Sequence, residues 1–285
     1  MSDRCNSIID FCRSLSQEAH ADPGGVRISL DSLTRKGFDI RGFTYDELRA
    51  ACVGLTYLLL YRGMNMVVTE DHAILWDTIG RELLDPPSLY FRESHNAPFP
   101  AEYHAFRELF VTTIKTSTGE WNLFQKHTIS KWKWFQMPAE YPEVHVMNPA
   151  AYLVYPLLEA VLKETLSSFI ERNGIVRARF TVPGRTYNSD GRTRCNRVDD
   201  HMLVLLGQQS HLADLNNDLS LIYAHIAFLY PGRDPISVIS QEWRNPAMHG
   251  EDNISTAFGV VLNIALFIAM DYVKDELKKR LPKGA

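Results

Sequence analysis

Residues 254–272 read ISTAFGVVLNIALFIAMDY, and this stretch decides the class of fold. Its apolar side chains recur at helical spacing, at positions Ile254, Ala257, Phe258, Val261, Ile264, Ala265, Ile268 and Tyr272. The turns that follow are rich in lysine and arginine, which suit the negative end of a helix dipole. The apolar run is too short to span a bilayer and contains Asn263, so it predicts a core helix.

Helical patterns recur along the rest of the chain. In the N-terminal part, residues 45–61 and 70–84 have helical spacing, and Thr44 or Asp46 is placed to cap the first helix. In the C-terminal part, helices are expected from Asn148 as N-cap to about residue 170, over 201–230 with a break near Asn216, and over 235–244. The sequence therefore predicts a mainly α protein.

Three prolines mark a junction at residues 137–149, MPAEYPEVHVMNP, because each disfavours helix in the residue before it. We expect residues 1–140 to form a mostly helical region of sensory or regulatory role, with room for a few short strands. The alternating lysines and tryptophans of residues 126–135 suggest one such strand. Residues 148–285 are expected to form a helical bundle.

The composition indicates a globular protein. Of 285 residues, 45% are hydrophobic and 22% charged, with a formal net charge of −4, so any nucleic-acid site has to be local. The four cysteines lack the spacing of a zinc or redox site, and the N-terminus does not resemble a signal peptide. We expect free thiols, a cytoplasmic location, no membrane association, no metal and no cofactor.

A second informative stretch, residues 243–250, reads WRNPAMHG. Pro246 disfavours helix at Asn245, so the short helix should end at about Arg244. His249 then lies in the turn before the final helix, and its side chain and that of Arg244 are able to converge. Arginine binds phosphate oxygens, and histidine is the usual acid or base near neutral pH. The pair suits metal-independent RNA cleavage, with histidine moving protons and arginine stabilising phosphoryl charge.

The string WRNPAMHG resembles the Arg-x4-6-His motif of the HEPN superfamily, in its Arg-Asn-x-x-x-His-Gly form. The resemblance covers about residues 148–280 and is specific over eight residues. It implies an all-α homodimeric endoribonuclease, in which two motifs face one RNA groove, and a role as a toxin or anti-phage abortive-infection effector. It also implies that Arg244 and His249 are catalytic and that Asn245 is a polar helper. Pro246 departs mildly from the family pattern, stiffening the turn without removing a catalytic group.

Two further features have a functional and a structural interpretation. Some HEPN proteins use an acidic residue on the first helix, which implies a helper role for Glu159; the alternative is an ion pair with Lys163, four residues later. The connection 177–197 holds six arginines against one acid. Its Arg185, Arg192, Arg194 and Tyr187 are candidates for RNA binding, and a solvated loop is the alternative.

Other functions remain compatible with the sequence. One is a catalytically silent HEPN-like module that binds nucleic acid or a protein partner, and another is a signal-sensing protein. Retention of both Arg244 and His249 favours the enzyme. An antitoxin or regulatory partner would be needed to restrain a toxin of this kind.

Overall fold

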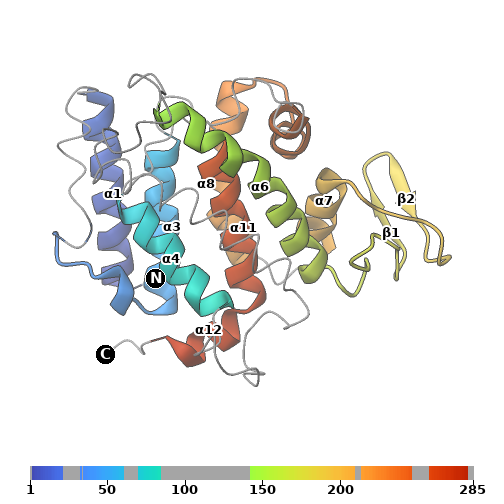
Figure 1. Cartoon of the computed structure of the whole chain (residues 1–285), viewed down its shortest axis with the longest axis horizontal. Coiled ribbons are helices and arrows are strands. Elements are labelled where there is room, and N and C mark those ends of the chain that lie inside the picture. The colour runs from blue at the N-terminus through green and yellow to red at the C-terminus, as the bar shows by residue number, and fades with distance from the viewer. Residues whose placement is uncertain are drawn as a thin grey trace, which may run out of the picture.

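The computed structural model describes residues 2–21, 33, 35–60, 70–84, 142–208, 213–245 and 257–281. Within these residues the protein is mainly helical, which confirms the predicted fold class (Figure 1). The helices are α1 (Asp3–Ala21), η1 (Ile40–Gly42), α3 (Tyr45–Leu59), α4 (Glu70–Leu84), α6 (Pro142–Thr165), α7 (Val198–Gln208), α8 (Ala213–Leu229), α9 (Pro235–Ser237), η3 (Val238–Trp243), α11 (Phe258–Tyr272) and α12 (Lys274–Arg280). The strands are β1 (Phe180–Val182) and β2 (Arg185–Tyr187).

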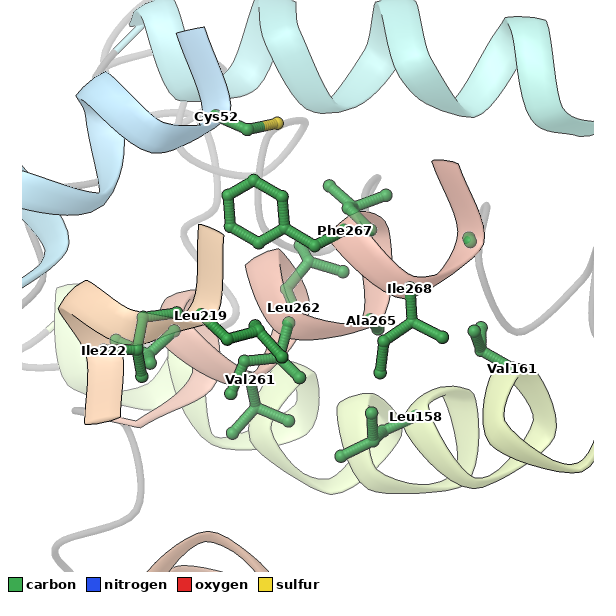
Figure 2. Packing of buried hydrophobic residues seen from close by; sticks show 14 of the residues in the cluster. Cys52, Leu158, Val161, Leu219, Ile222, Val261, Leu262, Ala265, Phe267 and Ile268 are labelled. Carbon is green, nitrogen blue, oxygen red and sulfur yellow. The ribbon is translucent and has the colours of Figure 1, made fainter. Parts of the chain in front are cut away.

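Helix α11 is the centre of the bundle and contacts α3, α4, α6 and α8. Every residue from Phe258 to Met270 is buried, so this helix is covered on all sides. In Figure 2, Ile268 points toward α6, while Phe267 points toward Cys52 of α3. The predicted core helix is confirmed over Phe258–Tyr272, and Val273 separates it from α12. Ile254, near the predicted start, lies outside the described residues.

The one asparagine of α11 joins three helices inside this core. Trp76 of α4 donates through Nε1 to Asn263 Oδ1 at 2.9 Å, and Asn263 Nδ2 donates to Thr56 Oγ1 of α3 at 3.1 Å. The Thr56 hydroxyl in turn donates to the carbonyl of Cys52 at 2.6 Å. We call these four residues the Asn263 cluster. Each of these polar side-chain groups has a partner, as buried polar groups require.

Helix α6 corrects the predicted start of the C-terminal part. The expected cap at Asn148 is wrong, because α6 begins at Pro142 and continues through Pro149 and Pro156. Pro142 takes the first helical position, where a missing N–H is harmless. Pro156 is exposed, and burial of the neighbouring Val154, Leu157 and Leu158 against the core offsets the cost of a proline inside a helix, about 3 kcal/mol. One hydrophobic core contains residues from both sides of the predicted junction.

The remaining elements show what local patterns did and did not reveal. The predicted cap at Thr44 is confirmed, with a full capping box completed by Glu47. The expected break near Asn216 is wrong, because that residue lies inside α8. Residues 126–135, where a strand was predicted, lie outside the described part of the chain. None of the helices within the described ranges combines the length and hydropathy of a transmembrane span.

The arginine-rich connection (residues 177–197) was expected to be a loop and instead contains a β-hairpin. Strands β1 and β2 pair antiparallel, with Phe180 opposite Tyr187 and Val182 opposite Arg185. The turn is Pro183-Gly184, and Gly184 has a φ of 77°, which favours glycine. The hairpin projects beside α7, away from α1 and α3 (Figure 1).

Candidate functional site

Arg244 lies at the end of an unusual helix. Residues Val238–Trp243 form the π-helix η3, and the backbone N–H of Arg244, its C-cap residue, donates to the carbonyl of Gln241. Asp234 caps the preceding turn, with Oδ2 accepting from Ser237 N at 2.9 Å. Single turns of π-helix occur frequently at functional sites. Asn245 is exposed at the end of this described segment, and residues 246–250, including His249, lie outside the described residues.

Helix α6 carries three polar side chains at four-residue intervals, and the middle one contacts Arg244. Tyr155, Glu159 and Lys163 follow one face of the helix. Glu159 Oε1 lies 2.7 Å from Lys163 Nζ, and Glu159 Oε2 lies 3.7 Å from Arg244 Nη2. The predicted ion pair of Glu159 with Lys163 is confirmed, and the same carboxylate also lies near the arginine of the motif. The helper role that the resemblance implies for Glu159 stays a prediction.

His201 of α7 lies against the same face of α6. Its imidazole is fully buried, and Nε2 donates to the carbonyl of Cys195 at 3.1 Å, which leaves Nδ1 as an acceptor. Burial lowers the pKa of His201 below its ordinary value, against the opposing effects of the Cys195 carbonyl and the Glu159 charge, so the ring is neutral at neutral pH. We call Tyr155, Glu159, Lys163, His201 and Arg244 the Arg244 cluster.

Three buried atoms of the Arg244 cluster have no hydrogen-bond partner among the described residues. They are the hydroxyl of Tyr155, Nδ1 of His201 and Nε of Arg244. Leaving such a group unpaired costs about 1–3 kcal/mol. Costs of this kind are often found at functional sites, which makes the Arg244 cluster a candidate site.

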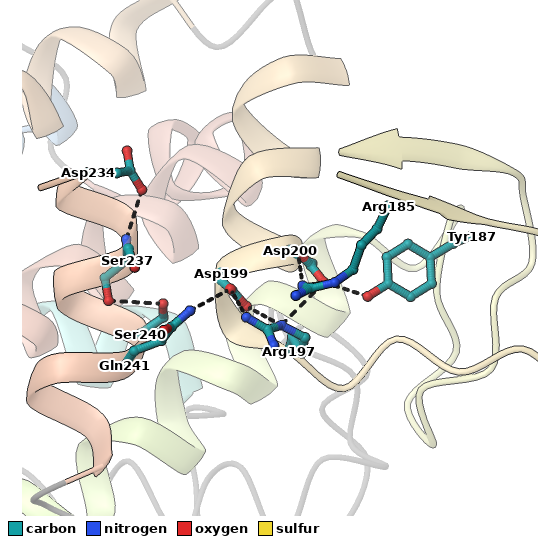
Figure 3. Close-up of polar contacts among 9 residues, drawn as sticks. All are labelled: Arg185, Tyr187, Arg197, Asp199, Asp200, Asp234, Ser237, Ser240 and Gln241. Carbon is teal, nitrogen blue, oxygen red and sulfur yellow. Dashed lines mark hydrogen bonds and ion pairs between the residues drawn. The ribbon is translucent and has the colours of Figure 1, made fainter. Parts of the chain in front are cut away.

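Two residues expected to bind RNA have structural partners instead. The hydroxyl of Tyr187 donates to Asp200 (Figure 3). The ring of Tyr187 stacks on Phe180, with centroids 4.9 Å apart. Only 9% of Tyr187 is exposed, so its ring has no free face for a base. Arg185 Nη1 donates to both oxygens of the buried Asp200 carboxylate, at 2.9 and 3.2 Å. Both side chains fasten the hairpin to α7.

The same polar network reaches η3. Arg197 donates to Asp199 and lies 3.5 Å from Asp200, and Gln241 Nε2 donates to Asp199 Oδ2 at 3.1 Å (Figure 3). Burial tends to raise the pKa of Asp199, but hydrogen bonds, chiefly from Arg197, lower it below its ordinary value. Gln241 precedes Arg244 by three residues. The hairpin, α7 and the helix that ends at Arg244 are therefore joined by charged hydrogen bonds.

Arg192 and Arg194 differ from the other arginines just described. Both are exposed, and neither pairs with an acid among the described residues. Between them, the Thr193 backbone N–H donates to Asp190 at 2.6 Å, and the Arg192 backbone N–H donates to the same oxygen at 2.9 Å. The backbone of this turn is fixed while the two guanidinium groups stay available to solvent.

No set of three metal-binding side chains occurs within the described ranges, and all four cysteines are buried free thiols. Tyr155 and His201 were missed as site residues. Tyr155 had a usable signal, because it precedes Glu159 by one helical turn, whereas His201 comes from a distant helix. Comparison of the chain with models of known families, with curated proteins and with solved structures finds no match.

Proposed function

We propose that the protein is a metal-independent endoribonuclease of the HEPN type, with Arg244 and His249 as the catalytic pair and Asn245 as a polar helper. The observation that carries this proposal is the contact between Glu159 and Arg244. It holds the motif arginine, 31% exposed, beside buried polar groups that have no partner of their own among the described residues. A surface arginine of purely structural role has no need of such surroundings.

The proposed reaction uses only these side chains. The ribose 2′-oxygen attacks the adjacent phosphorus, and the bond from phosphorus to the 5′-oxygen breaks. His249 either takes the proton of the 2′-hydroxyl or supplies the proton of the leaving 5′-hydroxyl. Arg244 stabilises the charge that builds on the phosphoryl oxygens. The products are a 2′,3′-cyclic phosphate and a 5′-hydroxyl.

Glu159 acts in this scheme as a positioning residue. Its carboxylate is shared between Lys163 and Arg244, and Lys163 offsets its negative charge. An unshared carboxylate would hold the guanidinium more strongly and compete with a phosphate. The shared one fixes the direction of Arg244, whose side chain is 31% exposed, and competes less with a phosphate.

The RNA strand beyond the cleaved bond is proposed to contact Arg192 and Arg194. Their exposed guanidinium groups lie in the arginine-rich connection, which the Asp200 and Asp199 network joins to η3. Arg185 and Tyr187, first considered as direct RNA ligands, support this surface by anchoring the hairpin. Phosphate contacts of this type bind RNA without sequence preference.

The biological role follows from the resemblance alone. We propose a homodimer with two motifs facing one RNA groove, acting as a toxin or abortive-infection effector in the cytoplasm. Residues 1–140, or a separate antitoxin, would restrain the activity. Light scattering on dilute protein tests the dimer, and a strict monomer would remove the shared groove.

RNA cleavage in the presence of EDTA tests the enzymatic proposal. We expect wild-type protein to cut mixed RNA, and Arg244→Ala and His249→Ala to lose about 100-fold or more of that activity. Arg233→Ala is the matched control, because Arg233 also pairs with an acid, Glu242 of η3, but lies outside the Arg244 cluster. Equal cleavage by all four proteins would refute the catalytic assignment. RNA binding without cleavage would favour a silent binding module.

A further inference from the structure

The π-helix η3 comes directly before Arg244 and sets the direction of its side chain. A π-helix pairs each N–H with the carbonyl five residues back, so its turn holds one more residue than an α-helical turn. One extra residue rotates everything after it by about 100° relative to an unbroken α-helix. The contact of Arg244 with Glu159 of α6, at 3.7 Å, therefore depends on whether this turn keeps its π-helical form.

Directional contacts are needed to hold such a turn. Ile239 and Trp243 of η3 are buried, but the hydrophobic effect that buries them is non-directional. A hydrogen bond requires a narrow geometry. Trp243 Nε1 donates to the hydroxyl of Tyr230 at 3.3 Å, and Gln241 Nε2 donates to Asp199 Oδ2 at 3.1 Å. The second bond is shorter and has a charged acceptor, so it is the stronger of the two.

Asp199 is itself held in place. It lies in the first turn of α7, where a negative charge suits the helix dipole. Arg197 donates to both oxygens of its carboxylate, through Nε at 3.1 Å and through Nη2. The Asp199 side chain is only 13% exposed. Figure 3 shows Gln241 reaching from η3 to this carboxylate, which acts as a fixed anchor on the neighbouring helix.

We propose that Gln241 is a positioning residue, whose hydrogen bond to Asp199 holds η3 in its π-helical form and so directs Arg244 toward Glu159 and the substrate phosphate. This inference rests on the proposed ribonuclease function. Without the bond, the turn is free to adopt the commoner α-helical form, which rotates Arg244 away from α6. A displacement of about 1 Å at a group that acts on the reacting atoms is enough to reduce the rate strongly.

Two unbranched substitutions of Gln241 test the inference. Gln241→Met removes the hydrogen-bond donor and keeps a side chain of similar length. Gln241→Lys supplies a new donor, an ammonium group on a stem long enough to reach Asp199. Glu242→Met is the matched control, because it removes the contact of the next η3 side chain with Arg233 and leaves α7 untouched.

The first readout is RNA cleavage. We expect Gln241→Met to lower kcat about 10-fold with little change in KM, Gln241→Lys to recover most of this loss, and Glu242→Met to retain the wild-type kcat. In an Asp199→Ala background, Gln241→Met and Gln241→Lys should give the same kcat, because the carboxylate that distinguishes them is gone. A purely structural role would not produce rescue that depends on Asp199.

The second readout needs no RNA. Phenylglyoxal modifies accessible guanidinium groups, and mass spectrometry of the peptides gives the rate at each arginine. Arg244, 31% exposed beside Glu159, should react about 3-fold faster or more in Gln241→Met and at the wild-type rate in Gln241→Lys. Arg233, 68% exposed, is the internal reference in these three proteins. An unchanged rate at Arg244, or an unchanged kcat in an active protein, would overturn the inference.

The two readouts separate the two proposals. If Gln241→Met exposes Arg244 while the wild type cuts no RNA, the positioning contact stands and the ribonuclease is refuted. If the wild type cuts RNA and Gln241→Met keeps both its kcat and its rate of modification at Arg244, the ribonuclease stands and the role of Gln241 is refuted.

Discussion

The Asn263 cluster and the Arg244 cluster are both polar groups set among the helices of one bundle, and they differ in how well they are satisfied. Around Asn263, the amide, the Trp76 indole and the Thr56 hydroxyl all have hydrogen-bond partners inside the core. Around Arg244, three buried atoms, from Tyr155, His201 and Arg244, have none among the described residues.

We propose that this difference separates a structural role, at Asn263, from a functional one, at Arg244. The hydrogen bonds of the Asn263 cluster join α3, α4 and α11 and specify how these helices pack. An unsatisfied cluster costs stability, and costs of this kind are often found at functional sites. The two clusters should therefore respond oppositely to substitution, one in stability and the other in activity.

The largest expected effect is on stability, at Asn263. Asn263→Ala leaves the Trp76 indole N–H buried without its acceptor and opens a small cavity, so we expect a loss of about 2–4 kcal/mol in the free energy of unfolding. Urea denaturation measures this loss. Asn216→Ala on the exposed face of α8 is the control and should change stability by less than about 0.5 kcal/mol. A loss as small as the control's would show that the Asn263 cluster does not stabilise the core.

Lowering the pH should reduce the free energy of unfolding through His72, which lies beside Trp76 of the Asn263 cluster. His72 is fully buried, donates through Nε2 to the Leu55 carbonyl and packs 5.5 Å from the Trp76 ring. Burial lowers its pKa from 6.5 to about 4, so the unfolded chain takes up a proton first as the pH falls. Stability should therefore decrease as the pH falls from about 6.5 toward about 4.

The expected size of this acid effect is about 2 kcal/mol between about pH 7 and about pH 5. Urea denaturation at both pH values measures it, and His72→Gln should remove that share of the pH dependence. The same slope in wild type and His72→Gln would show that this histidine does not couple the core to pH.

At the Arg244 cluster, a conservative change should affect activity more than stability. Glu159→Gln keeps the shape of the side chain and removes the charge that holds Arg244, so we expect kcat to fall about 10-fold while KM changes little. Glu164→Gln, on the same helix and paired with Arg172 instead, is the control. A loss of stability without a change in kcat would place Glu159 with the structural residues.

The smallest effect is expected at the arginine-rich connection. Replacing Arg192 and Arg194 by alanine removes two exposed positive charges without disturbing the Asp200 anchor. RNA affinity should fall a few-fold, and its dependence on the logarithm of salt concentration should become shallower by about 1.4, which is ~0.7 for each of the two phosphates that the variant no longer neutralises. An unchanged salt dependence would show that Arg192 and Arg194 do not contact RNA phosphates.

The sequence predicted those features that depend on neighbouring residues. The apolar period of α11 and the cap at Thr44 are local patterns, and both were found in the structure. The Pro183-Gly184 turn was an equally local signal for the hairpin, but the connection was predicted to be a loop. The helical path of α6 through Pro149 and Pro156 was not predictable, because burial of its apolar face overrides the local effect of proline.

The candidate site was predictable only in part for the same reason. Arg244 was found from the motif. Glu159 was found from the family resemblance and from its spacing of four residues to Lys163. The unpartnered state of Tyr155, His201 and Arg244 within the described residues depends on how α6, α7 and η3 pack, which no local pattern reveals. The anchoring of Tyr187 by Asp200 depends on contact between the hairpin and α7, and it likewise changed the interpretation of a residue chosen by type.

The central claim, that the Arg244 cluster supports metal-free RNA cleavage, is tested most directly by the ends of the product. A short oligoribonucleotide is incubated with the wild-type protein in EDTA, and the fragments are weighed by mass spectrometry. A matching oligonucleotide with 2′-O-methyl groups serves as the uncleavable control. The account predicts fragments ending in 2′,3′-cyclic phosphate from the first substrate and none from the second. An uncut first substrate, or fragments with 3′-hydroxyl ends, would contradict it.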